Sequence, residues 1–174
     1  MNSNTRQQLE KWLHTLNIIG SVIDVGGSSL HVKGRTNTWD VDKYVVADVK
    51  KADFIWDFNQ PLTVYDEYEN VFCLEMMEYV YDPLTVAKNL RLLTRKGGRL
   101  FISTHFLFPH HSGGEDCLRY TRIGICKLLT KVGFEIVSIT PRMAVDDSLP
   151  TALDLESKRQ YHRGEIGHLI EATC

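Results

Sequence analysis

Long apolar runs, paired cysteines and an excess of positive charge are all missing from this sequence. No apolar run approaches the ~20 residues that cross a bilayer, and the polar residues 1–12 lack the apolar stretch of a secretory signal. The four cysteines include no C-x-x-C pair, so neither a zinc knuckle nor a redox pair is predicted. The net charge of −2 gives no strong signature of nucleic-acid binding. We therefore predict a cytoplasmic protein without a membrane segment.

What the chain does have is the balance of a globular domain. Apolar residues make up 43% and charged residues 24% of the 174 residues, which is typical of a folded domain and not of a disordered or fibrous chain. That length suffices for one domain with a substantial core and falls short of two ordinary domains. We predict a single domain over residues 1–174. Nothing in the sequence predicts the oligomeric state.

Helical and extended segments alternate along the chain. Leu9, Trp12, Leu13 and Leu16 have the spacing of one helix face. A second helix is predicted over residues 84–93, with its stop at the Lys-Gly-Gly of residues 96–98, and a third after the N-cap Thr121. Apolar and β-branched runs predict seven strands, at residues 21–25, 44–47, 54–56, 71–74, 99–103, 134–140 and 166–172.

These strands are apolar nearly throughout, which favours a mostly parallel sheet covered by helices on both faces. The predicted fold is therefore an α/β, Rossmann-like domain with a seven-stranded sheet, in which the last two strands are antiparallel. In such sheets, ligands bind outside the carboxyl ends of the strands.

Four acids stand at predicted strand ends, namely Asp24, Asp48, Asp57 and Glu75. Asp24 precedes the glycine turn and would repel a pyrophosphate, but it suits an ammonium group. Asp48 can accept both hydroxyls of a ribose, and Asp57 can accept an adenine amino group, with Phe58 beside the ring. A ligand with a cationic amino end, a ribose and an adenine, and no phosphate, fits the description of S-adenosylmethionine. The alternative for each acid alone is a turn former or helix cap.

The same segments resemble class I S-adenosylmethionine-dependent methyltransferases. The resemblance runs from about residue 20 to 140 and is carried by residues 22–29 (VIDVGGSS), Asp48, 56–62, 68–80, 92–100 and 116–134. The segment 116–121 (DCLRYT) resembles a subgroup with D-x-x-R-Y-T after the fifth strand. The resemblance implies a methyltransferase domain that binds S-adenosylmethionine. The cofactor residues it implies are Asp24, Gly26, Gly27, Ser28, Asp48, Asp57, Phe58, Leu74 and Glu75.

Two departures from that family keep a second hypothesis open. Ser28 and Leu30 stand where the family has its second and third motif glycines, and Glu78-Tyr79 stands where it frequently has a Glu-His pair. The alternative function is a degenerate, non-catalytic binding module that works through a partner.

The polar loop after the fifth strand is the candidate catalytic segment. We predict that His105 or His110 takes the proton of the methyl acceptor, because imidazole titrates near neutrality, and that Asp116 and Arg119 hold the loop. A solvated surface loop is the main alternative. A metal site from His105, His110, Asp116 and the neighbouring His111 lacks helical ligand spacing, so no metal is predicted. The acceptor stays unidentified: a small molecule, a sugar or an accessible group on a larger molecule.

Overall fold

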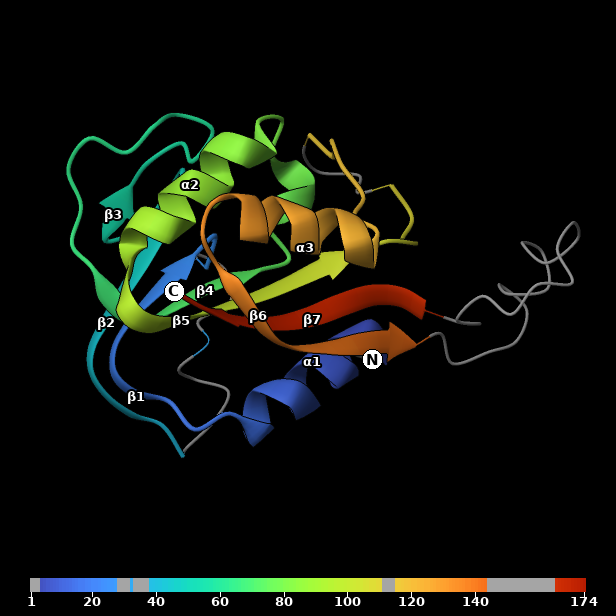
Figure 1. Cartoon of the computed structure of the whole chain (residues 1–174), viewed down its shortest axis with the longest axis horizontal. Coiled ribbons are helices and arrows are strands. Elements are labelled where there is room, and N and C mark those ends of the chain that lie inside the picture. The colour runs from blue at the N-terminus through green and yellow to red at the C-terminus, as the bar shows by residue number, and fades with distance from the viewer. Residues whose placement is uncertain (1–3, 28–31, 33–37, 111–114, 144–164) are drawn as a thin grey trace, which may run out of the picture.

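The computed structural model describes residues 4–27, 32, 38–110, 115–143 and 165–174. Its described strands form one seven-stranded sheet in the order β3-β2-β1-β4-β5-β7-β6 (Figure 1). Six strands run in one direction, and β7 lies antiparallel between β5 and β6. The predicted mostly parallel seven-stranded α/β sheet is thereby confirmed. The strands are β1 Ile19–Val25, β2 Asp40–Asp48, β3 Phe54–Ile55, β4 Tyr68–Leu74, β5 Thr94–His105, β6 Glu135–Met143 and β7 Glu165–Thr173.

Helices cover both faces of the sheet, as predicted. Helix α1 (Asn4–Thr15) lies on one face, and α2 (Pro83–Leu93) and α3 (Arg122–Lys131) lie on the other (Figure 1). The central strands serve both sides because successive side chains point to opposite faces. Phe72 and Phe101 stack in the core beneath α1, whereas Val71 and Leu100 belong to the core beneath α2 and α3. None of the described helices is long and apolar enough to span a bilayer.

Helices α2 and α3 begin at side-chain caps. The Asp82 carboxylate accepts a hydrogen bond from the Thr85 backbone N–H at 3.1 Å, with Pro83 in the first turn. Thr121 accepts from the Gly124 N–H at 3.1 Å, which confirms the predicted cap. Both caps lie just beyond the carboxyl ends of β4 and β5, so they fix the segments that lead away from that edge.

Helix α2 ends at Leu93, as predicted, but the Lys-Gly-Gly of residues 96–98 does not form its stop. The helix stops at Leu93, and residues 94–98 already belong to β5. Thr94 pairs with Tyr68, and the register then shifts before Asn70 pairs with Arg99. Gly97 has a φ of +75°, which glycine adopts without strain. The glycines therefore shape an irregularity within a strand and do not terminate a helix.

Asn89 fastens the loop after β3 to α2. Its buried amide donates to the carbonyls of Phe58 (2.9 Å) and Gln60 (2.8 Å) and accepts from the Leu62 N–H (3.0 Å). One side chain thus satisfies three backbone groups of a loop that has no regular structure of its own.

We expect Asn89→Ala to lower the free energy of unfolding by about 1–3 kcal/mol, because it leaves buried backbone groups unpaired. Urea unfolding followed by circular dichroism measures this loss. Lys88→Ala, at an exposed neighbouring position on α2, is the control and should change stability by less than about 0.5 kcal/mol. Equal stability of the two variants would contradict the role of Asn89.

Candidate functional site

The carboxyl ends of β1, β2 and β4 meet in one row. Strand β1 lies between the other two, and Val25 at its end pairs with Ala47 on one side and with Cys73 on the other. The residues that follow these strands therefore share one edge of the sheet. Asp48 closes β2 and Glu75 follows β4, so the topology brings them to the glycine turn after β1.

That turn requires both of its glycines. Gly26 has a φ of +80°, and its N–H donates to the Ala47 carbonyl at 2.7 Å. A Cβ on Gly26 would lie 2.7 Å from Met76 Cγ, and a Cβ on Gly27 would lie 2.3 Å from Asp24 Cγ. The backbone thus packs directly on Asp24, which leaves no room for a side chain there. Ser28 lies outside the described residues.

Asp24 is the buried acid beneath the turn. Its carboxylate is 1% exposed and accepts the Tyr44 hydroxyl at 2.8 Å and the Val32 N–H at 3.2 Å. These donors fix the orientation of the carboxylate and stabilise its charge, so it lies close to the turn with a defined geometry.

The residues predicted to hold the ribose and the adenine are placed differently from one another. Asp48 is half-buried and accepts the Val49 N–H at 2.6 Å. Asp57 is exposed, and its side chain accepts the backbone and side-chain N–H groups of Asn59. The Phe58 ring is buried in the core beneath α2 and α3, and the Phe58 carbonyl accepts the Asn89 amide.

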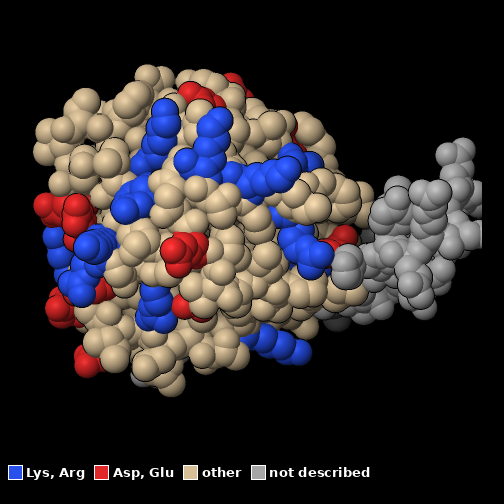
Figure 2. Space-filling view, viewed as in Figure 1, with Lys and Arg blue, Asp and Glu red and all other residues tan. Residues whose placement is uncertain are grey.

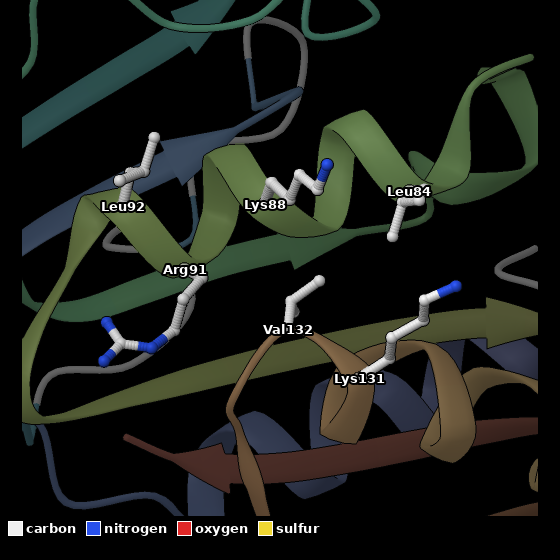
Figure 3. Close-up of a pocket in the computed structure, with 6 residues that line it drawn as sticks. All are labelled: Leu84, Lys88, Arg91, Leu92, Lys131 and Val132. Atoms are coloured by element: carbon white, nitrogen blue, oxygen red, sulfur yellow. The ribbon is translucent and has the colours of Figure 1, made fainter.

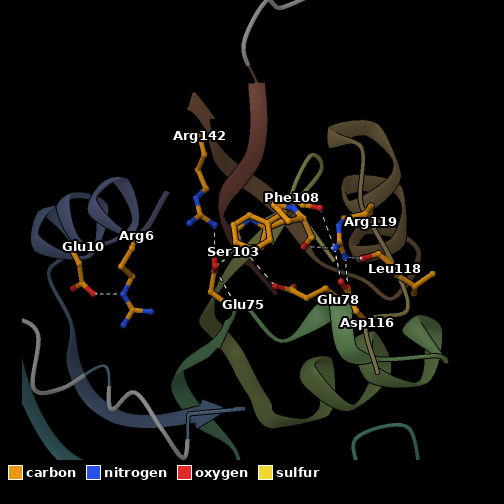
Figure 4. Close-up of polar contacts among 12 residues, drawn as sticks. Arg6, Glu10, Glu75, Glu78, Ser103, Phe108, Asp116, Leu118, Arg119 and Arg142 are labelled. Carbon is orange, nitrogen blue, oxygen red and sulfur yellow. Dashed lines mark hydrogen bonds and ion pairs between the residues drawn. The ribbon is translucent and has the colours of Figure 1, made fainter. Parts of the chain in front are cut away.

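Glu75 links the ends of β4, β5 and β6 (Figure 4). Its carboxylate accepts Ser103 Oγ at 2.6 Å and Arg142 Nη1 at 2.5 Å, and it contacts His105 Nε2 at 2.5 Å. Glu75 itself has a φ of +55°, a conformation that is uncommon outside glycine. Arg142 is fully buried, and Glu75 supplies the negative charge that makes this burial possible.

The Glu75 carboxylate stays ionised in this setting. Burial alone would raise its pKa, but the hydrogen bond from His105 and the charge of Arg142 outweigh burial and lower the pKa to about 2. An ionised carboxylate only accepts hydrogen bonds. His105 must therefore donate from Nε2, and in the neutral ring this leaves the lone pair on Nδ1.

Glu78 is a second acid beside the same imidazole. It lies in the short 3-10 helix η2 (Met77–Tyr79), is 1% exposed, and has Oε1 3.7 Å from His105 Nε2. Neither of its carboxylate oxygens has a hydrogen-bond partner among the described residues. Burial, followed by the nearby charge of Glu75, raises the pKa of Glu78 to about 7.

Only one of the two candidate histidines belongs to this cluster. It is His105, the last residue of β5. His105 is 2% exposed, and Phe108 stacks on its ring at 4.2 Å between centroids. His110 is exposed, and His111 lies outside the described residues. Asp116 and Arg119 form an ion pair, and Arg119 also reaches the carbonyls of Phe108 and Pro109 at 3.4 Å.

Glu75, Glu78 and His105 have donor atoms within 4.8 Å of one another, which is the donor set of a metal site. Arg142, however, already neutralises Glu75 at 2.5 Å, so one of the two charges that would hold a divalent cation is already used. We therefore assign no metal to this set. Asp116 is held by Arg119, and His110 does not join the described cluster.

Sequence reasoning missed several members of the site. Arg142 and Ser103 lie within strands and carry no motif, and Glu78 stands out in the sequence only by the absence of a histidine after it. A weak signal did exist, since an arginine within a predicted sheet needs a buried partner if its side chain faces the core. Which acid would serve as that partner depends on the pairing of β5, β7 and β6.

A groove between α2 and α3 lies apart from the strand-end acids. It has a volume of about 470 Å³ and is lined only by residues of the two helices and the turn that follows α3 (Figure 3). Figure 2 shows Lys and Arg side chains gathered over these helices. The groove contains none of the acids or imidazoles described above, so we assign the chemistry to the strand ends. The lining residues are Leu84, Lys88, Arg91, Leu92, Lys131 and Val132.

Glu78 predicts an unusual pH dependence of stability. Folding raises the pKa of Glu78 from 4.5 to about 7, so the folded protein binds the proton more tightly than the unfolded chain does. This contribution to the free energy of unfolding is therefore full below pH 4.5 and is lost as the pH rises through 7. We expect the stability of the protein relative to Glu78→Gln to fall by about 3 kcal/mol between pH 4.5 and 8.

Urea unfolding across that pH range measures the difference between the two proteins. Glu67→Gln, at an exposed acid, is the control and should show no such trend. A pH-independent difference between the wild type and Glu78→Gln would mean that Glu78 is ionised throughout.

Comparisons with known proteins agree with this architecture. No protein-family model matches the chain. A stretch of 39 residues, 22% of this chain, is 51% identical to the ubiquinone biosynthesis O-methyltransferase of Aeromonas salmonicida, but it spans only 16% of that protein.

Solved structures match over nearly the whole chain. An S-adenosylmethionine-dependent methyltransferase from Mesorhizobium loti superposes with a TM-score of 0.68 at 12% identity, over 97% of each chain. The Burkholderia thailandensis 1,6-didemethyltoxoflavin-N1-methyltransferase, solved with its substrate and S-adenosylhomocysteine, gives 0.66 at 12% identity, over 98% of this chain and 77% of that one. The predicted class I methyltransferase fold is thereby confirmed.

Proposed function

We propose that this chain, as one domain over residues 1–174, is an S-adenosylmethionine-dependent methyltransferase. One observation carries the proposal: the ends of β1, β2 and β4 bring a tight glycine turn and three acids to one edge of the sheet. A fold alone does not determine function. The placement of ligand-binding groups where parallel sheets bind nucleosides supports this function.

Each strand end has a proposed share of the cofactor. Asp24, Gly26, Gly27 and Ser28 hold the methionine end, where the closely packed turn lets the backbone approach the ligand. Asp48 accepts the ribose hydroxyls. Asp57 and the backbone of Phe58 form the adenine side, and Asn89 supports that loop from below. Leu74 and Glu75 form the wall next to the transferred methyl group.

His105 is the proposed proton acceptor at the reacting centre. Glu75 fixes its tautomer through Nε2, so Nδ1 is the nitrogen that takes the proton. The segment 116–121 supports the histidine from the other side: the Tyr120 N–H donates to the His105 carbonyl, and the Tyr120 hydroxyl donates to the Met77 carbonyl at 3.1 Å. Asp116 and Arg119 hold the loop above it. This is the role we propose for the D-x-x-R-Y-T segment.

The second candidate is a binding module that holds the cofactor without transferring its methyl group. The burial of His105 under Phe108 favours it, because an acceptor must displace Phe108 or approach along another side of the ring. Release of S-adenosylhomocysteine in the presence of pooled phenols, sugars and amines separates the two. Cofactor binding without any release would favour the binding module.

The cofactor proposal predicts the effect of Asp48→Ala. Loss of a charged hydrogen-bond acceptor should weaken S-adenosylmethionine binding by about 1.5–3 kcal/mol, as measured by isothermal titration calorimetry. Asp42→Ala, at an exposed acid near the start of the same strand, should leave the affinity unchanged. Equal affinity of both folded variants would remove the ribose assignment, and tighter binding of NAD than of S-adenosylmethionine would reject the function.

The catalytic proposal distinguishes His105, at the end of β5, from His110 in the loop that follows. His105→Ala should lower turnover by about 10²–10⁴-fold, the usual share of general base catalysis, while cofactor affinity barely changes. His110→Ala should retain turnover, because His110 is exposed and outside the cluster. S-adenosylhomocysteine release with an acceptor found in the pools measures both. Full turnover of His105→Ala would show that alignment alone drives the reaction.

A further inference from the structure

Glu78 is the buried charged group that the proposed reaction has not yet used. Its side chain is 1% exposed, and both carboxylate oxygens lack hydrogen-bond partners among the described residues. A buried acceptor without a donor costs about 1–3 kcal/mol. An alanine or leucine would avoid that cost, so the carboxylate requires an explanation other than stability.

The position of Glu78 is tightly fixed. Its carbonyl accepts the Cys117 N–H at 2.7 Å and the Leu118 N–H at 3.1 Å, which ties η2 to the segment before α3. The Tyr120 hydroxyl binds the preceding carbonyl, that of Met77. The carboxylate is therefore held toward His105, from a turn that the D-x-x-R-Y-T segment keeps in place.

Six charged or titratable groups surround this carboxylate, and two of them, the Cys73 thiol of β4 and the Tyr79 phenol of η2, are influenced by its charge. Glu75 from the end of β4 repels it, and His105 from β5 attracts it at 3.7 Å. Arg119, in the segment before α3, attracts it more weakly, and Tyr120 from the same segment lies close enough to be influenced by it. Of these groups, His105 is the one with an ion-pair distance to Glu78.

The two acids beside His105 are not equivalent. Glu75 is balanced by the buried Arg142 and by the Ser103 hydroxyl, so most of its charge is already compensated. It can orient the imidazole, but it offers little net negative charge to a ring that has gained a proton. Glu78 has no such cation at contact distance among the described residues.

We propose that Glu78 is the counter-charge of the His105 imidazolium, and that the methyl acceptor is therefore an O–H or N–H group that loses a proton on transfer. This inference rests on the proposed function. Glu78 acts through His105 and is a positioning residue, whereas His105 touches the acceptor. No histidine follows Glu78 in the sequence, but His105 at the end of β5 lies beside it in the fold.

The step balances in atoms and charge. A lone pair of the acceptor attacks the methyl carbon, the C–S bond breaks with its electrons left on sulfur, and the sulfonium becomes a neutral thioether. The acceptor proton passes to His105 Nδ1. The cluster then contains two carboxylates, one guanidinium and one imidazolium, which sum to zero charge, as buried groups require. The imidazolium later gives its proton to water.

The test measures protonation of His105 directly and needs no acceptor. In ¹⁵N-histidine-labelled protein, NMR titration should show that Glu78→Gln moves the midpoint of His105 protonation to lower pH by about one unit or more. Glu78→Asp should restore much of that shift. Glu115→Gln, at an exposed acid of the same loop, should leave the midpoint where it is in the wild type.

An unchanged midpoint in folded Glu78→Gln would overturn the proposal, and so would a wild-type ring that is protonated on Nδ1 in its neutral form. Failure of the proposed function is read separately, as absence of S-adenosylmethionine binding by calorimetry. A structural role alone would alter the unfolding free energy of Glu78→Gln and leave the His105 midpoint unchanged.

Discussion

The contact on which the site depends is the ion pair between Glu75 and Arg142. It joins the residue after β4 to a fully buried arginine of β6, across the intervening β5 and β7. A buried guanidinium is tolerated only with a partner, so the carboxylate has to stay ionised at this edge. That ionised state in turn forces His105 to donate from Nε2. The tautomer of the imidazole on β5 is thus set by a contact that begins on β6, two strands away in the sheet.

The proposed cofactor end depends on close packing more than on charge. Gly26 and Gly27 allow the turn after β1 to lie against Met76 and Asp24, and any side chain there would push the turn away from the edge. The opposite pattern holds at the proposed reacting end, where polar groups from the end of β4, from η2 and from β5 converge in a largely buried cluster. A tight backbone suits a ligand that must be held, and a buried acid–imidazole cluster suits a proton that must be moved.

The short stretch of sequence identity and the similarity of structure over nearly the whole chain support different conclusions. The match to a curated methyltransferase covers less than a quarter of this chain, whereas structures at 12% identity match nearly all of it. The first is a local likeness of sequence, and the second indicates a shared architecture. The proposed acceptor site lies at the loops beyond β4 and β5, and loops are where proteins of one fold differ most in sequence and ligand.

The sequence by itself determined the order of helices and strands, the two-faced sheet and the row of acids at its edge, because these follow from local periodicity and from the topology of parallel strands. It misread Gly97 and Gly98 as the stop of α2, whereas they belong to β5, since Thr94 already pairs with Tyr68. It also could not pair Glu75 with Arg142 or bring His105 to Glu78. Those contacts join residues that are 67 and 27 apart in the chain, so only the register of the folded sheet decides them.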